Sequence, residues 1–521
     1  MLSGSMNDAV GRRTMKCVIV VKLSRLISCY IRRRCFIAFS IISISLLILQ
    51  GILFSSSDKR PQANDRKILE SKITNILHSG SLPAAFNRAI RVENLLFDKN
   101  IAQPVTDNNE KLVAVVLVMA AKRERAIRNH LDQLIKLRPS AVQFPIVISQ
   151  DGDDQAVMEA ISSFTSEEKK ITFIHHKGRT ELPSYLDSGS KNYFRIARHY
   201  KWALDEIFFK MKYEMAIITE DDLDLADDFF SYFAALKPIL LADETIWCIS
   251  AWNDNGGANI TDRKHGEKLY RTDFFPGLGW MLTAQLWNEL SASWPEMYWD
   301  DWMRRQDVRK ERVCIRPEVS RTSHNNDLAG KGSSGGLYKK YLASIRLPEI
   351  AVDFSKLDLS YLIKSNYDSF LNQEISGAVV LSTDNFLDKT FSGSGPFLVT
   401  YKTPREYRRL GKSVGLMLDI RSGMPRTAYY GIVTFMYCSE RFYAVPEKLN
   451  LSAPNFGLQP SSDYYNEKWD KMTRYLEFQE TYCTPTKYNG KCDPKDPNLI
   501  AWFAKKRLSK RLKHWGEMII N

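Results

Sequence analysis

The strongest constraint on the fold is a series of mainly apolar, strand-like runs between residues 112 and 219. LVAVVLVMA (112–120) is continuously apolar and rich in β-branched residues, which predicts a strand buried on both faces. FPIVIS (144–149), ITFIHH (171–176) and YEMAIIT (213–219) predict three more strands. Together, these four runs predict a buried sheet.

Amphipathic helical patterns separate these runs, around 127–137, 154–164 and 193–211. Strands and helices that alternate with short loops predict an α/β fold with a doubly wound, mostly parallel sheet. Ligands bind such sheets beyond the carboxyl ends of the strands. The residues that follow each apolar run are therefore the first candidates for a functional site.

Three adjacent carboxylates, Glu220, Asp221 and Asp222, follow the last of these runs. They repel one another unless a cation lies among them. Period-two strand geometry would place Glu220 and Asp222 on the same side. Hard oxygen ligands suit Mn²⁺ or Mg²⁺ held jointly with a diphosphate. Most short acidic patterns are solvated turns, but the position directly after a buried strand favours a metal site.

A second acidic pair, Asp300 and Asp301, lies between Trp299 and Trp302. Aromatic rings pack on the apolar faces of sugars, and a carboxylate can take a hydroxyl proton as general base. The alternative is the start of an amphipathic helix, where the helix dipole favours acids. By itself, the segment more often indicates the helix start.

Weaker candidates come from single residues and one glycine-containing turn. Arg123 and Asp151 follow the first and second apolar runs, although each alone is more often a turn residue. His199 lies on the predicted helix 193–211, where a half-buried core histidine is the alternative. The glycines of FFPGLGW (274–280) would let the backbone approach a ligand closely, or would simply form a packed turn.

Residues 35–54 predict a membrane anchor. The segment is uncharged and long enough to cross a bilayer. Arginines at 32–34 precede it, and positive charge on that side predicts a cytosolic N-terminus and a lumenal body. A cleaved signal peptide would have a shorter apolar core that starts earlier. A buried helix would not lie between an arginine cluster and a polar stretch.

The distribution of charge argues against a nucleic-acid partner. The formal net charge is +13, but most of the excess lies within 1–34 and 501–521. A nucleic-acid enzyme would need a basic stripe on its folded body. In an oxidising lumen, the cysteines beyond the anchor could form two disulfides with one left over. They are Cys248, Cys314, Cys438, Cys483 and Cys492.

Several segments together resemble the N-acetylglucosaminyltransferase I family of animals, in order over roughly 110–445. They are IARHYKWAL, ITEDDLDLADDFFSYF, WCISAWNDNG, LYRTDFFPGLGWMLTAQLW, YWDDWMRR, IRPEVSRT, LDLSYL and GIVTF. These enzymes move GlcNAc from UDP-GlcNAc in β1,2 linkage onto the α1,3-linked mannose of N-glycans. The resemblance implies a GT-A type fold, an inverting mechanism, Mn²⁺ and a single-pass type II location in the Golgi membrane.

The resemblance also implies roles for individual residues. It makes Asp222 the metal ligand and Asp300 the general base for the mannose hydroxyl. It implies a disulfide between Cys248 and Cys314. The residues implied to contact UDP-GlcNAc are Arg123, Asp151 and His199 at the uridine end, Glu220 and Asp221, and Ser333 and Ser334 in a closing loop.

The chain departs from the family pattern at several places. Ala121 and Gly152 stand near the positions of a second family disulfide. KRERAIR (122–128) is only loosely similar, and the loop 324–330 is longer and differently composed. Residues 447–521 have no family counterpart.

The predicted organisation has six parts, with a smaller domain after the catalytic one. They are a cytosolic tail (1–34), the anchor (35–54), a stem (55–109), the nucleotide-sugar-binding catalytic domain (110–335), a linker and smaller second domain (336–446), and the extension (447–521).

Three other functions compete with GlcNAc transfer to N-glycans. The nearest is β1,2-GlcNAc transfer to O-linked mannose on proteins, although RTDFFPGLGW and WDDWMRR favour the N-glycan enzyme. A metal-dependent phosphohydrolase would hydrolyse UDP-GlcNAc without an acceptor. A catalytically silent sugar-binding protein would show no turnover, and retention of both acid clusters argues against it.

Overall fold

The structure is a computed structural model, and part of the chain is not described by it. Within the described residues, no helix is both long and apolar enough to cross a bilayer. The predicted tail, anchor and stem, and the loop with Ser333 and Ser334, lie outside the described residues. The structure describes residues 111–521 apart from 178–181, 185, 187–189, 330–337, 448, 450–467, 510, 514 and 516–521.

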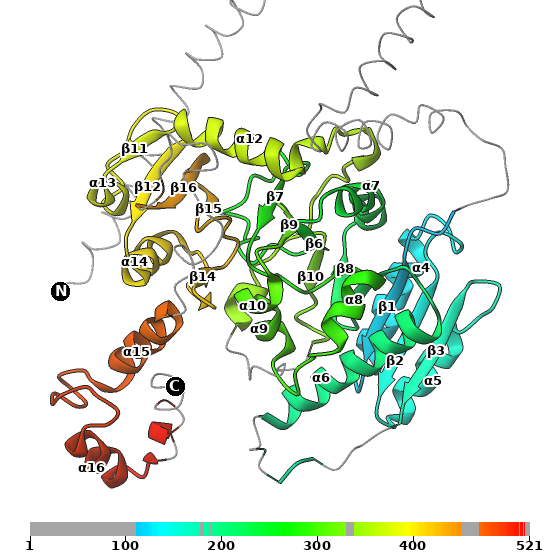
Figure 1. The fold of residues 1–521 in the computed structure, drawn as a ribbon, viewed down its shortest axis with the longest axis horizontal. Helices are drawn as coiled ribbons and strands as arrows, with labels where there is room; N and C mark the ends of the chain where they lie inside the picture. Colours follow the sequence, from blue (N-terminus) through cyan, green and yellow to red (C-terminus); the bar gives the residue numbers. More distant parts are fainter. Residues whose placement is uncertain are drawn as a thin grey trace, which may run out of the picture. The chain divides into compact units, whose positions relative to one another are not determined.

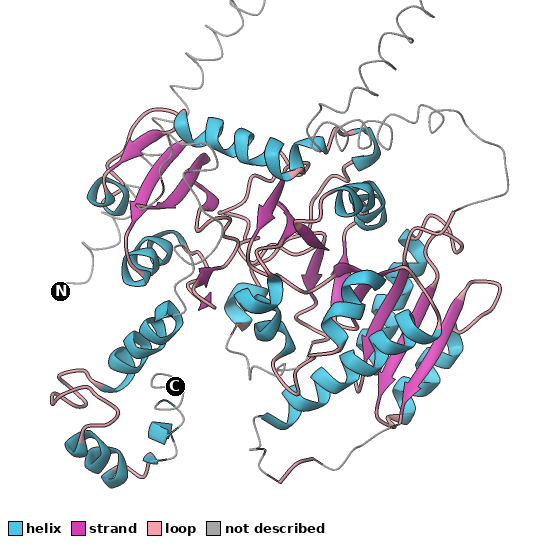
Figure 2. Ribbon diagram, in the orientation of Figure 1, coloured by secondary structure: helices cyan, strands magenta, loops and turns pink. Residues whose placement is uncertain are grey.

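An eight-stranded sheet forms the centre of the fold, in the order β3-β2-β1-β4-β8-β6-β9-β7 (Figures 1 and 2). The first four strands are parallel, whereas β8 runs antiparallel to β4 and β6, and β7 antiparallel to β9. The strands are β1 (Val115–Ala120), β2 (Ile146–Asp151), β3 (Ile171–His176), β4 (Met215–Glu220), β6 (Ile246–Ser250), β7 (Leu269–Thr272), β8 (Trp280–Thr283) and β9 (Val313–Pro317).

The predicted α/β fold is confirmed, and the four strands read from the sequence are β1 to β4. The sheet is mixed, because β6 and β9 also pair in parallel beyond these four strands, whereas β8 and β7 are antiparallel to their neighbours. Strands β6 to β9 have four or five residues each. Such short strands leave no long apolar run in the sequence, so the mixed half of the sheet was missed.

The sheet is doubly wound because its two faces pack into different apolar cores. Val116 and Val118 of β1 face a core shared with α4, α5 and α7, whereas Val115, Leu117 and Met119 face one shared with α6 and α8. The predicted burial of this strand on both faces is confirmed. The helices are α4 (Glu124–Leu137), α5 (Gln155–Phe164), α6 (Ser190–Asp205), α7 (Phe229–Ala242) and α8 (Ala284–Ser291).

A smaller four-stranded sheet follows, in the order β11-β12-β16-β15. The helices α12, α13 and α14 accompany it (Figure 1). Residues 107–521 form one compact unit. The elements are α12 (Lys364–Ser376), β11 (Val379–Leu381), α13 (Thr383–Leu387), β12 (Phe397–Tyr401), α14 (Pro404–Val414), β13 (Ile420–Arg421), β14 (Met424–Pro425), β15 (Val433–Tyr437) and β16 (Glu440–Pro446).

Two disulfides form among the five cysteines beyond the predicted anchor, as the sequence allowed. Cys248–Cys314 joins the neighbouring strands β6 and β9, which is the pairing that the family resemblance implied. Cys483–Cys492 lies in the extension, between α15 (Lys468–Tyr482) and α16 (Pro497–Lys505). Cys438 takes part in neither disulfide.

A buried ion pair anchors the segment that leads from β9 to the site. Both nitrogens Nε and Nη2 of Arg321 donate to Asp228, at 3.1 and 3.2 Å. The exposed fractions of the two side chains are 0% and 1%. Arg321 also donates to the carbonyl of Gly266. The guanidinium and the carboxylate thus neutralise each other in a place that solvent does not reach.

Replacing Arg321 by alanine should therefore destabilise the protein strongly, because Asp228 would remain buried without its partner. We expect the free energy of unfolding to fall by about 3–5 kcal/mol, measured by urea denaturation. The matched control is Arg263→Ala, which breaks an exposed pair with Glu349 and should cost about 0–1 kcal/mol. Equal losses in the two variants would contradict a structural role for the buried pair.

Candidate active site

The carboxyl ends of the parallel strands meet at one edge of the sheet, beside a cavity of about 790 Å³. Register pairs Met119 of β1 with Glu220 of β4, so the residues that follow these two strands are neighbours. The structure thereby brings together residues that are far apart in the sequence. The predicted site residues that line the cavity are Arg123, Asp151, His199, Glu220, Asp221 and Asp300.

The acid turn, Glu220 to Asp222, is held by Arg123 and Tyr200. Arg123 donates from Nη2 to Asp221 and from Nη1 to Asp222. The hydroxyl of Tyr200 donates to Glu220 at 2.8 Å. β4 ends at Glu220, and a turn follows. The expected period-two alternation therefore stops before Asp222, and it is Asp221 and Asp222 that share one guanidinium.

The three carboxylates have different proton affinities. Burial raises the pKa of Asp221 to about 7, against the lowering effect of Arg123. Burial and the nearby charge of Asp222 also raise the pKa of Glu220. Burial would raise the pKa of Asp222 as well, but hydrogen bonding from His324 and the charge of Arg123 hold it below its usual value. Asp222 is thus the carboxylate best suited to stay ionised.

The acid turn fits a divalent cation that shares its ligands with a diphosphate. Asp222 is 4% exposed, and its Oδ1 has no hydrogen-bond partner, like Oδ2 of Asp221. Among the described residues, no group of three or more His, Cys, Asp or Glu side chains could hold a metal by itself. A hard cation that uses one or two carboxylates and completes its shell with phosphate oxygens matches this donor set.

A second polar group lies at the ends of β2 and β3. Asp151 accepts from Nδ1 of His176 at 2.8 Å. The rings of His176 and His199 stack with centroids 5.7 Å apart, and Nε2 of His199 lies 2.7 Å from the hydroxyl of Ser149. Burial lowers the pKa of His199 to about 4. A neutral imidazole beside a carboxylate offers hydrogen bonds without a net positive charge.

The second acidic pair lies in the first turn of α9 (Trp299–Arg304). Arg304 donates from Nη1 to Oδ2 of Asp300 at 2.9 Å and to Oδ1 of Asp301 at 2.7 Å. Asp301 also pairs with Arg421 at 3.4 Å, whereas the side chain of Asp300 is 44% exposed. The segment is therefore the start of a helix and also lines the cavity, and Asp300 is the more accessible of its two acids.

Of the two tryptophans expected to pack on a sugar, Trp299 lines the cavity and Trp302 does not. Trp299 is 8% exposed and stacks on Tyr200, with centroids 4.3 Å apart, in the core between α6 and the sheet. Trp302 packs edge-on against Trp294, and it does not line the cavity. The aromatic residues hold α9 in place, because their rings pack against one another and are thereby removed from solvent.

The glycine turn before β8 does line the cavity. Gly277 and Gly279 have φ values of 68° and 93°, which favour glycine. A Cβ on Gly279 would lie 2.7 Å from the side chain of Thr322. Gly277 and Leu278 line the cavity. The turn is thus both a packed corner and a cavity wall, and the two interpretations left open by the sequence are compatible.

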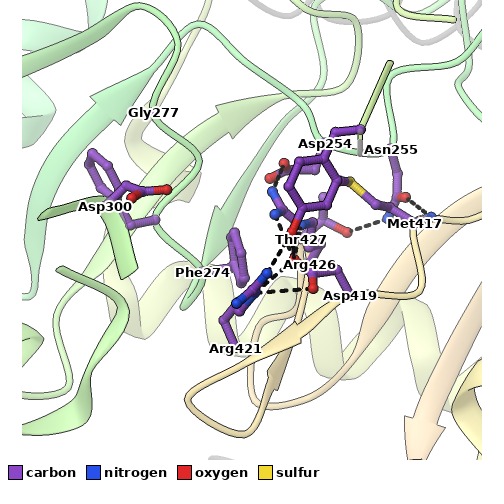
Figure 3. Close-up of polar contacts among 12 residues, drawn as sticks. Asp254, Asn255, Phe274, Gly277, Asp300, Met417, Asp419, Arg421, Arg426 and Thr427 are labelled. Atoms are coloured by element: carbon purple, nitrogen blue, oxygen red, sulfur yellow. Dashed lines mark hydrogen bonds and ion pairs between the residues drawn. The ribbon is translucent and has the colours of Figure 1, made fainter. Parts of the chain in front are cut away.

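The cavity is completed by residues of the second region that sequence reasoning missed. Arg426 pairs with Asp254 and with Asp419, and Arg421 pairs with Asp419 (Figure 3). Burial would raise the pKa of Asp419, but the two arginines hold it at about 2. Asp254 lies in WNDNG, a segment of the family resemblance. For Arg421, no local signal exists, because its partner Asp301 is 120 positions away.

The comparison with known families agrees with this arrangement. The sequence profile of the GNT-I family matches residues 85–455. The chain belongs to the GNT-I family. An alpha-1,3-mannosyl-glycoprotein 2-beta-N-acetylglucosaminyltransferase of Arabidopsis thaliana is 38% identical over 345 residues, which are 65% of this chain and 75% of that protein. The match includes residues 447–455 of the predicted extension, for which no family counterpart was expected, and residues 456–521 lie outside it.

Solved structures give only distant likenesses to this GNT-I family chain. One is the mannosyltransferase PcManGT from Pyrobaculum calidifontis in complex with GDP-Man and Mn²⁺, with a TM-score of 0.28, 13% identity, and coverage of 63% of this chain and 77% of that one. Another is glucosyl-3-phosphoglycerate synthase from Mycobacterium tuberculosis with Mn²⁺, UDP-glucose and phosphoglyceric acid. Its TM-score is 0.26, its identity is 12%, and the match covers 44% of this chain and 78% of that one. Scores this low support no inference about this chain.

In this member of the GNT-I family, a buried histidine of α4 contacts the residues on either side of the acid turn. Nδ1 of His130 lies 2.6 Å from the carbonyl of Leu223, and Nε2 lies 2.9 Å from the hydroxyl of Thr219. Because a carbonyl can only accept, Nδ1 carries the proton and Nε2 accepts from Thr219. Burial lowers the pKa of His130 to about 4. The neutral ring thus ties both ends of the acid turn to α4.

The pKa of His130 predicts a pH-dependent stability. The unfolded state binds a proton near pH 6.5 and the folded state only near 4, so stability is present above 6.5 and is lost as the pH falls towards 4. His130→Gln should make this slope shallower by up to about 1.4 kcal/mol per pH unit. Denaturation between these pH values measures it. An unchanged slope would contradict a neutral, buried imidazole.

Proposed function

We propose that this chain is an inverting glycosyltransferase that moves GlcNAc from UDP-GlcNAc in β1,2 linkage to the α1,3-linked mannose of N-glycans. Membership of the GNT-I family and the 38% identical plant relative support this activity. The observation that carries the proposal is that Glu220 and Asp221 of the acid turn line the same cavity as Asp300, with Asp222 next to them but not among the lining residues. A donor diphosphate and an acceptor hydroxyl can therefore meet between them.

The donor would lie along the carboxyl edge of β1, β2 and β4, in a fold of the GT-A type. Asp151 and His199 would hold the uridine end, since a carboxylate and a neutral imidazole suit its hydroxyl and imide groups. Arg123, Glu220 and Asp221 would contact the sugar nucleotide further along the cavity. Ser333 and Ser334 remain predicted contacts in the loop outside the described residues.

Asp222 would hold Mn²⁺ jointly with the diphosphate. When bound, the ion neutralises negative charge on the leaving diphosphate. Arg123 contacts both Asp221 and Asp222, so its guanidinium is also placed to balance charge at this edge. UDP departs as an anion and needs no proton, so a general acid is not required.

Asp300 would act as the general base. The acceptor oxygen attacks the anomeric carbon on the face opposite UDP, so the new bond has inverted configuration, and the hydroxyl proton passes to the carboxylate. Arg304 contacts Oδ2 of Asp300, which leaves Oδ1 to accept the proton. Asp301 is less suited, because Arg304 and Arg421 both pair with it.

The substrates can be tested with a fragment that begins at residue 61. We expect it to be soluble and to transfer GlcNAc from UDP-GlcNAc with Mn²⁺ to N-glycans that end in α1,3-linked mannose. Peptides with O-linked mannose and acceptor-free samples are the controls, with products followed by mass spectrometry. Preference for O-linked mannose, hydrolysis without acceptor, or no turnover by the folded fragment would each overturn the proposal in favour of one competing function.

The base can be tested by comparing two neighbouring isosteric changes. Asp300→Asn removes basicity and should lower kcat by about 10²–10⁴-fold, with little change in UDP-GlcNAc affinity because the base faces the acceptor. Asp301→Asn should have a milder effect. Steady-state kinetics and nucleotide binding by calorimetry measure both. If Asp301→Asn were the more damaging at equal folding, the base would be assigned to the wrong carboxylate.

We also propose that residues 35–54 anchor the chain in the Golgi membrane as a single-pass type II protein, with the catalytic part in the lumen. The uncharged length of the segment and the arginines before it support this topology. The membrane and the mannose-terminated glycoproteins would then be its partners, with no role for nucleic acid.

A further inference from the structure

A histidine that sequence reasoning did not assign lies beside Asp222. Nε2 of His324 is 3.3 Å from Oδ2 of Asp222. Its side chain is 16% exposed, and its Nδ1 is buried without a hydrogen-bond partner. Oδ1 of Asp222 is likewise buried without a partner. A nitrogen and an oxygen donor thus converge at the acid turn, Nε2 of His324 and Oδ2 of Asp222, and each side chain has one further buried atom without a partner.

The backbone fixes this arrangement from two sides. His324 ends β10 (Thr322–His324), which pairs antiparallel with β5 (Leu223–Leu225), so that His324 lies opposite Leu223. The next residue, Asn325, donates its backbone N–H to the carbonyl of Asp222 at 2.8 Å. The imidazole is therefore held at the acid turn by the small sheet, independently of its own side-chain contact.

We propose that His324 is a second protein ligand of the divalent cation, binding through Nε2 beside Asp222. The proposal rests on the proposed function, which places the cation at Asp222. For a six-coordinate ion with bonds of about 2.1 Å, neighbouring donor atoms lie about 3 Å apart. The observed separation of 3.3 Å is close to this value. Imidazole nitrogen is a common metal ligand in proteins, and phosphate oxygens complete the shell.

The nitrogen ligand gives the site a preference among cations. Mg²⁺ favours oxygen ligands and keeps its waters, whereas Mn²⁺, a softer transition-metal ion, accepts an imidazole nitrogen more readily. Loss of His324 should therefore weaken Mn²⁺ binding more than Mg²⁺ binding. Arg123 also contacts Oδ2 of Asp222, so the guanidinium and the cation would compete for this oxygen.

The test is pulsed electron paramagnetic resonance of Mn²⁺ bound to the full-length chain in detergent with UDP, at about pH 8, where an ordinary imidazole is neutral. We expect the nitrogen modulation of a coordinated imidazole in the wild-type protein. It should change to the ¹⁵N pattern when only histidine is ¹⁵N-labelled. This labelling test uses the wild-type protein and therefore does not depend on the folding of a variant. It should vanish in His324→Ala and persist in His265→Ala, an exposed histidine paired with Glu267.

Affinity gives a second readout. His324→Ala should weaken Mn²⁺ binding with UDP by roughly tenfold or more, with a smaller change for Mg²⁺. Mn²⁺ bound to the wild-type protein without imidazole modulation, or modulation that survives in folded His324→Ala, would overturn the role of His324 and leave the proposed function standing. Failure of the wild-type protein to bind Mn²⁺ with UDP would overturn both.

Discussion

The parallel pairing of β1 with β4 is the constraint on which the site depends. Register places the end of β1 opposite Glu220, and the chain turns directly after each strand. Arg123 and the acid turn are consequently neighbours, although about a hundred residues separate them. The strands keep this register because each face of β1 packs into its own apolar core, and a slip of one residue would exchange the two faces.

Buried charge is the second organising feature. Arg321 with Asp228, and Arg426 with Asp254, are nearly inaccessible to water. Such pairs contribute little net stability compared with apolar contacts, but the loss of one partner is costly. They therefore favour a single arrangement of the segments that carry them. The second pair joins Arg426 of the smaller region to Asp254, and both residues line the cavity.

The cavity accordingly has two ends with different supports. The proposed donor end lies at strand termini of the large sheet, where neighbouring strands hold the backbone on both sides. The proposed acceptor end combines α9 with the β13–β14 hairpin, through the contact between Arg421 and Asp301. The acceptor end is therefore assembled from two regions of the chain.

The sequence by itself determined the α/β class and the strands β1 to β4, and it singled out the acids Glu220 to Asp222, whereas Asp300 stood out only through the family resemblance. It could do so because long apolar runs and adjacent charges are local signals. The tertiary structure decided which groups meet: Arg123 with Asp222, His324 with Asp222, and Arg421 with Asp301. It also placed most of the Trp299 ring in the core, although the residue still lines the cavity. These pairings depend on register and on packing between distant segments, which no local pattern encodes.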